Sequence, residues 1–89
     1  MIKTQSRSSF ARDVRKIKDK ALLRRVQDVV EAVEQARRLD EIPGIGKMEG
    51  WKRYYRIEVG DYRVGVAVDS DVVTFIRCLN RKDIYRYFP

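Results

Sequence analysis

Two arginines flank a glycine–aspartate pair in the second half of the chain, within the segment WKRYYRIEVGDYRVGV. Arg56 comes before this pair and Arg63 follows it, and both alternate with apolar residues. Arginine stays charged at physiological pH and can bind a phosphate through two parallel hydrogen bonds. If the two side chains face the same way, they could therefore grip a polyanion. The alternative is a solvated strand pair in which Glu58 and Arg63 form a surface ion pair that contributes about 0.5 kcal/mol.

Histidine is absent from the chain, and cysteine occurs once. This composition excludes Ser-His-Asp and Cys-His catalysis, histidine acid–base pairs and histidine metal sites. Cys78 lies in an apolar run, which favours a packed thiol in a reducing compartment over a nucleophile or a disulfide. We therefore expect no metal and no cofactor, and the electrostatic part of any catalysis falls to arginine.

The 89 residues carry 20 Lys and Arg against 13 Asp and Glu, which gives a net charge of +7. Such an excess favours an anionic partner: a nucleic acid, an acidic protein or a membrane surface. An ordinary basic soluble domain is the alternative. The N-terminal segment has no apolar stretch typical of a signal peptide or a membrane anchor. We expect a single cytoplasmic domain over residues 1–89, without membrane contact.

The first half of the chain predicts a short strand followed by two helices. The strand is expected over residues 2–5, and Ser8 or Ser9 could form the N-cap of the first helix. The apolar stripe of that helix consists of Phe10, Val14 and Ile17. Asp19 could cap a second helix over about residues 20–38, whose wider apolar face would pack on a sheet.

The second half predicts three strands and a short C-terminal element. Alternation of polar and apolar residues indicates strands at residues 54–59 and 62–68, and the apolar run at residues 72–80 indicates a third strand. Gly60-Asp61 fits a two-residue type II′ turn, and residues 69–71 fit a three-residue turn. The last nine residues could be a short helix or a frayed tail. The order β-α-α-β-β-β-α predicts an α+β fold, with a helical hairpin on one face of a mainly antiparallel four-stranded sheet.

The expected strand pairing divides these residues between two faces. With Gly60-Asp61 as the loop, Glu58 lies opposite Arg63 and Arg56 lies diagonal to it, on the reverse side from the apolar face. A three-residue second loop would place Arg63 opposite Arg77 and Gly65 opposite Phe75. The open face would then gather three arginines around a shallow concavity at Gly65 and Ala67. Because like charges placed opposite each other are destabilising, an anion between them would explain the arrangement.

Arg81 and Tyr85 are four residues apart, so a C-terminal helix would place them on one face. This helix would lie at the edge of the basic face. The alternative role for Tyr85 is structural, as an anchor of the helix beside Ile84 and Phe88.

The stretch YYRIEVGDYRVGVAVDSDVVTFIRCLNRKDIY resembles the RelE/ParE superfamily of bacterial toxins from type II toxin–antitoxin pairs. The matching features are a basic strand that ends in a turn, the YR pair that opens the next strand, an apolar strand, and the ending NRKDIY. The N-terminal segment SFARDVRKI and the Leu/Val-rich second helix match the helical hairpin of the family. The resemblance therefore covers nearly the whole chain.

The resemblance implies an endoribonuclease that cuts mRNA on the ribosome and is neutralised by a bound antitoxin. By position, it assigns catalysis to Arg56, Arg63, Arg81 and Tyr85. Glu58 departs from the RelE pattern, which has a second lysine there, and Lys52 or Arg53 could compensate. We expect the further RNA contacts to be Lys47, Lys52, Arg53, Arg77 and Lys82.

Two other functions remain open at this point. The ParE-like branch shares the fold but inhibits DNA gyrase without catalysis, and it does not retain the nuclease residue set. A toxin that has lost its activity and only binds its antitoxin is the other. The joint presence of Arg63, Arg81 and Tyr85 favours the nuclease. The expected partners are a cognate antitoxin in a hetero-oligomeric complex, the ribosome and mRNA.

Overall fold

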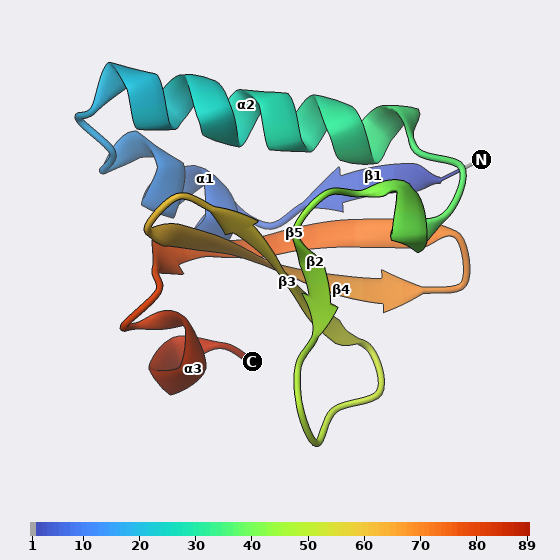
Figure 1. Ribbon diagram of the computed structural model, residues 1–89. Coiled ribbons are helices and arrows are strands. Elements are labelled where there is room, and N and C mark those ends of the chain that lie inside the picture. Colours follow the sequence, from blue (N-terminus) through green and yellow to red (C-terminus); the bar gives the residue numbers. More distant parts are fainter. Residues whose placement is uncertain (1) are drawn as a thin grey trace.

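The computed structural model describes residues 2–89 and shows two layers, a curved sheet and a helical hairpin packed on one of its faces (Figure 1). In chain order the elements are β1 (Lys3–Ser6), α1 (Ser8–Arg15), α2 (Lys20–Gln35), a 3₁₀ helix (Leu39–Glu41), β2 (Ile45–Lys47), β3 (Tyr54–Val59), β4 (Tyr62–Asp69), β5 (Val72–Asn80) and α3 (Ile84–Tyr87). The predicted α+β class and the helical hairpin are confirmed. Within the described residues, no helix has the length and apolar content needed to span a lipid bilayer.

The sheet has five strands in the order β1-β5-β4-β3-β2, one more than predicted. All neighbours are antiparallel except β1, which runs parallel to β5. The additional strand, β2, lies in the glycine-containing segment between α2 and β3, for which the sequence predicted no strand. It is only three residues long, too short to show an alternation of its own.

The main core lies between the sheet and the two long helices. Val26 and Val33 of α2 pack against Ile57 and Val64 of the central strands, and all four are at most 2% exposed. Asp19 caps α2 as predicted, since its Oδ1 accepts hydrogen bonds from the N–H groups of Ala21 and Leu22. At α1 the predicted serine cap is wrong, because the cap position is Arg7 and the Ser9 hydroxyl donates to the Ile76 carbonyl instead.

The pairing of β3 with β4 is the predicted one, with Ile57 opposite Val64 and Glu58 opposite Arg63. Gly60 has φ +57°, which suits the first central position of a type II′ turn. Arg56 and Glu58 therefore lie on the side of the sheet away from the helical hairpin, because strand side chains alternate between faces.

The predicted pairing of β4 with β5 is wrong. The turn between them has two residues rather than three, since Asp69 pairs with Val72, and a bulge follows between Gly65 and Val66. As a result Arg77 lies opposite Gly65, not opposite Arg63, and Phe75 lies opposite Val66 in the main core. The bulge allows Phe75 and Cys78 to face the helices while Ile76 faces the other side.

A second, smaller core covers part of the sheet face that was expected to be open. Met48, Ile84 and Phe88 are buried there, and α3 lies on the opposite side of the sheet from α1 and α2 (Figure 1). Phe88 occupies the place of the predicted concavity, because a Cβ at Gly65 would come within 2.8 Å of its ring. Gly65 is therefore a platform for Phe88 and does not form an anion cradle.

Candidate active site beside the C-terminal helix

Arg56 joins the sheet to α3. Its Nε donates a hydrogen bond to the hydroxyl of Tyr85 at 3.2 Å, and its Nη1 donates to the Gly44 carbonyl at 3.4 Å. The side chain is 25% exposed, so its stem is packed while part of the guanidinium stays accessible. These contacts hold the charge of Arg56 in one place before any substrate arrives.

Gly46 of β2 makes room for this arrangement. It pairs with Arg56 across the strand boundary, and a Cβ at position 46 would lie 2.4 Å from Nη1 of Arg56. The guanidinium therefore lies flat over the glycine. The sequence analysis missed Gly46. A glycine in a strand often marks a place where another group approaches the backbone closely, and this signal was available.

Glu58 stands between the two strand arginines. Its Oε2 lies 3.9 Å from Nη2 of Arg56 and 3.9 Å from Nη2 of Arg63, and its side chain is 52% exposed. One carboxylate thus reduces the repulsion between two guanidinium groups. Its carboxylate oxygens can only accept hydrogen bonds, whereas the guanidinium groups can only donate them. Arg56, Glu58, Arg63 and Tyr85 are called the cluster below.

Arg63 is turned back onto the β3–β4 turn. Its Nη1 donates to the carbonyls of Gly60 and Tyr62 at 2.9 and 2.8 Å, and only 14% of its side chain is exposed. The structure therefore brings Arg63 next to Glu58, as predicted, but its Nη1 makes two hydrogen bonds to the turn.

Arg81 approaches the same turn through its backbone, since its N–H donates to the carbonyl of Asp61 at 2.7 Å. The side chain is exposed, and among residues 2–89 it forms no ion pair. It precedes α3, which begins at Ile84, so the expectation that one helix carries both Arg81 and Tyr85 is wrong. Both residues belong to the C-terminal segment, which packs on the sheet through Ile84 and Phe88.

Tyr85 projects from α3 and is 63% exposed. The helix is anchored instead by Ile84 and Phe88, which are 0% and 3% exposed. The structural role considered for Tyr85 is therefore filled by its neighbours. Its hydroxyl accepts from Arg56 and keeps its own hydrogen available for donation.

Four of the additional RNA-binding candidates lie on three separate segments of the chain. Lys47 ends β2, Lys52 and Arg53 belong to the β2–β3 loop, and Lys82 precedes α3; all four are exposed. Arg53 also forms an exposed ion pair with Asp69 at 3.6 Å. Arg53 therefore lies at the end of β4 that is far from Arg63, and none of the four candidates is fixed by a buried contact.

Arg77 is held by a buried carboxylate that sequence reasoning missed. Asp13 of α1 accepts from its Nε at 2.7 Å and from its Nη2 at 3.3 Å, and the Asp13 side chain is only 3% exposed. Asp13 also accepts the backbone N–H of Cys78 at 3.0 Å. Asp13 lies three residues after Phe10, on the apolar side of α1, and a carboxylate at such a position could have indicated a buried ion pair. This geometry favours a structural role for Arg77.

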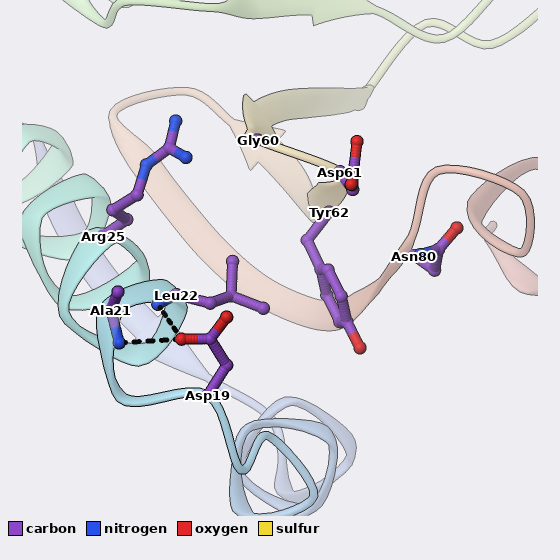
Figure 2. A pocket seen from close by; sticks show the side chains of 8 residues that line it. All are labelled: Asp19, Ala21, Leu22, Arg25, Gly60, Asp61, Tyr62 and Asn80. Atoms are coloured by element: carbon purple, nitrogen blue, oxygen red, sulfur yellow. Dashed lines mark hydrogen bonds between the residues drawn. The ribbon is translucent and has the colours of Figure 1, made fainter.

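A cavity of about 280 Å³ lies between the start of α2 and the β3–β4 turn (Figure 2). Arg25 approaches Gly60 there, with Nη1 2.8 Å from the place a Cβ would occupy. The lining includes two carboxylates, Asp19 and Asp61, so the site is poorly suited to a phosphate.

The sequence profile of the family described as ParE toxin of type II toxin–antitoxin system, parDE, matches residues 6–85. Toxin RelE3 of Methanocaldococcus jannaschii is 35% identical over 82 residues, which cover 91% of this chain and 92% of that protein. The chain belongs to the RelE/ParE toxin family.

Solved structures agree with this assignment. A chain of the RelB–RelE antitoxin–toxin complex from Methanococcus jannaschii is 33% identical, with a TM-score of 0.80, covering 96% of this chain and 99% of that chain. The YoeB dimer from Staphylococcus aureus gives a TM-score of 0.72 over 90% of this chain and 97% of that chain. At 14% identity, that second match supports the fold alone. The sequence-based prediction of a RelE-like toxin is thus confirmed.

The toxin has one cysteine, and it lies in the main core rather than in the cluster. Burial raises the pKa of the Cys78 thiol to about 12, and the nearby Asp13 carboxylate adds to the effect. The thiol is therefore protonated at neutral pH, as expected for a packing residue.

Proposed function

We propose that this toxin cleaves mRNA on the ribosome, by attack of a ribose 2′-hydroxyl on the adjacent phosphate. The observation that carries the proposal is the hydrogen bond between Arg56 and Tyr85, which fixes a cation and a phenol side by side on an exposed surface. A phosphoryl transfer needs positive charge at the phosphate and groups that move protons. The cluster around Arg56 contains both.

Each member of the cluster has a distinct proposed role. The 2′-hydroxyl gives its proton to the Glu58 carboxylate as its oxygen bonds to phosphorus, and the bond to the 5′-oxygen breaks. Tyr85 donates its hydroxyl hydrogen to that leaving oxygen. Arg56 binds the negative charge that builds up on the phosphate, and the exposed Arg81 side chain closes on the same group. Arg63 positions Glu58 and the β3–β4 turn.

Dependence on the ribosome follows from the exposure of these groups. Glu58 is 52% exposed and Tyr85 is 63% exposed, so water competes for both in the free protein. Such a surface gives little orientation to a flexible RNA strand, and orientation is a large part of catalysis. The ribosome would supply a fixed strand, and Lys47, Lys52, Arg53 and Lys82 would help to dock the toxin on it. This activity would place the toxin in the cytoplasm.

A cognate antitoxin is the second proposed partner. The relative from Methanococcus jannaschii, 33% identical, was solved as a RelB–RelE antitoxin–toxin complex. By analogy, we propose that this toxin is kept inactive in a hetero-oligomeric complex with an antitoxin of its own. With a net charge of +7 on the toxin, an acidic segment would be the complementary partner.

The test is a reconstituted cleavage reaction. Purified toxin is added to ribosomes programmed with a defined mRNA and, separately, to the same mRNA without ribosomes. The expected result is cleavage within translated codons on the ribosome and little cleavage of free RNA. A parallel gyrase supercoiling assay should show no inhibition. Intact mRNA together with inhibited gyrase would contradict the proposal and favour the ParE-like function.

A further inference from the structure

A second cavity lies on the same side of the sheet as the candidate active site, on the other side of α3. Its volume is about 400 Å³, within the range of pockets that hold small ligands, about 300–1,000 Å³. Its lining includes Arg7, Tyr54, Ile76, Arg77, Tyr87 and Phe88. Tyr85 and Tyr87 are two positions apart on a helix, so they point to nearly opposite sides of α3. Tyr85 meets Arg56, whereas Tyr87 lines this cavity.

The cavity carries positive charge that is in part already oriented. Asp13 holds Nε and Nη2 of Arg77, which leaves the donors of Nη1 for a ligand. Arg7 is exposed, and within residues 2–89 its guanidinium forms no ion pair. No aspartate or glutamate of the described chain lines the cavity, in contrast to the cavity beside α2. Because Asp13 balances the charge of Arg77, the positive charge that suits an anion is that of Arg7, and Arg77 adds the free hydrogen-bond donors of Nη1.

Aromatic rings form the rest of the wall. Tyr54 is packed edge-on between Trp51 and Phe88, with ring centroids 5.5 and 5.6 Å away, so its position is fixed. Tyr87 is 56% exposed, and the guanidinium of Arg86 lies 5.9 Å from its ring. A planar group could therefore stack on Tyr87 without displacing any core residue.

We propose that this cavity is a nucleotide subsite, which holds one unstacked base and its phosphate from the RNA strand that Arg56 and Tyr85 act on. The base stacks on Tyr87 against the wall formed by Tyr54, and the phosphate binds Arg7 and Nη1 of Arg77. Single-stranded RNA is recognised by this combination of aromatic faces and arginines. An acidic peptide would use the arginines but would leave the aromatic faces without a planar partner. The inference rests on the proposed function, because it assumes an RNA substrate.

Two variants remove the two halves of the subsite. Arg7→Ala removes an exposed cation, and Tyr87→Leu keeps apolar bulk while it removes the ring. Arg12→Ala is the charge-matched control, because Arg12 is exposed on α1 and does not line the cavity. Tyr87→Phe is the control that keeps the stacking ring. The probe is a short single-stranded oligoribonucleotide of mixed sequence, titrated into the purified protein and followed by fluorescence anisotropy.

We expect Tyr87→Leu to bind the oligoribonucleotide about tenfold more weakly than the unchanged protein. The affinity of Tyr87→Phe should be close to that of the unchanged protein. Arg7→Ala should weaken binding and lower the slope of log Kd against log salt by about one, while Arg12→Ala should not. On programmed ribosomes, Arg7→Ala and Tyr87→Leu should raise KM and leave kcat nearly unchanged.

The outcomes separate the subsite from the proposed function. RNA binding that depends on Arg7 and Tyr87, without any cleavage by the unchanged protein, would support the subsite and contradict the nuclease. If the unchanged protein cleaves mRNA, and Arg7→Ala and Tyr87→Leu bind and cleave RNA as well as Arg12→Ala does, the subsite is overturned and the nuclease function stands. Weaker binding of the antitoxin with unchanged RNA binding would also overturn it, and would assign the cavity to a protein contact.

Discussion

The Nε of Arg56 donates a hydrogen bond to the hydroxyl of Tyr85 at 3.2 Å, across 29 residues of sequence. This contact joins β3 to α3 and defines the candidate active site of the toxin. It forms because Ile84 and Phe88 dock α3 on the sheet, and because Gly46 leaves room for the guanidinium. The position of Arg56 therefore depends on residues that do no chemistry.

Gly46→Ala is expected to lower cleavage while the protein remains folded. The new methyl group would lie 2.4 Å from the present position of Nη1, and Arg56 would have to move away from Tyr85. Because the obstructing atoms belong to the end of a flexible side chain, the backbone need not shift. We expect about a tenfold loss of kcat, similar to a misplaced catalytic group. Ile45→Val in the same strand is the control. A Gly46→Ala protein with full activity would show that the position of Arg56 over β2 is unimportant.

Glu58→Gln is expected to strengthen RNA binding and to slow cleavage. The substitution removes a negative charge from beside Arg56 and Arg63, so an RNA phosphate meets less repulsion. It also removes the proposed proton acceptor, for which we expect about a 100-fold loss of kcat. Glu49→Gln removes the same charge from the exposed β2–β3 loop and should change neither quantity. Cleavage by Glu58→Gln at the original rate would place the proton acceptor elsewhere.

Asp13→Ala is expected to lower the free energy of unfolding by about 3 kcal/mol, because it leaves the partly buried Arg77 and the Cys78 N–H without their partner. Asp28→Ala is the matched control, since it breaks an exposed ion pair with Arg24 at 3.9 Å. That change should cost at most about 0.5 kcal/mol. Urea unfolding followed by circular dichroism gives both values. Equal effects of the two substitutions would contradict the structural role of Asp13.

The Cys78 thiol is expected to resist alkylation in the folded toxin. Its pKa is raised from 9.0 to about 12 by burial, so the reactive thiolate is scarce at pH 9. Iodoacetamide should react slowly at that pH and rapidly after unfolding in urea. Because only the unfolded chain releases the proton between pH 9 and about 12, this group lowers stability as the pH rises through that range. Cys78→Ala should lack this component. Equal labelling rates with and without urea would show that the thiol is accessible.

Local patterns were sufficient to predict much of the fold. The apolar run that follows the turn near residues 69–71 gave the bounds of β5, and the Gly60-Asp61 pair predicted the register that places Glu58 opposite Arg63. The end of α2 was predicted too late. The helix stops at Gln35, and the N–H of Arg37 donates to the side chain of Glu41 instead.

What the sequence could not reveal depended on contacts between distant segments. The bulge beside Gly65 is stabilised by the burial of both Phe75 and Cys78, and a strict period of two cannot represent that choice. It moved Arg77 from the predicted pair with Arg63 to the pair with Asp13. The C-terminal helix lies beside the face that carries Arg56, as predicted, but the hydrogen bond between Arg56 and Tyr85 depends on how α3 docks.

The most direct test of the account is a primer-extension map of mRNA from cells that express the toxin. We expect cuts within translated codons for the unchanged protein, and a loss of about 100-fold in cut frequency for Arg56→Ala and for Tyr85→Phe. Tyr87→Phe, on the other side of the same helix, should cut normally. Cuts of undiminished frequency in both the Arg56→Ala and the Tyr85→Phe strains would contradict the assignment of the active site to this pair.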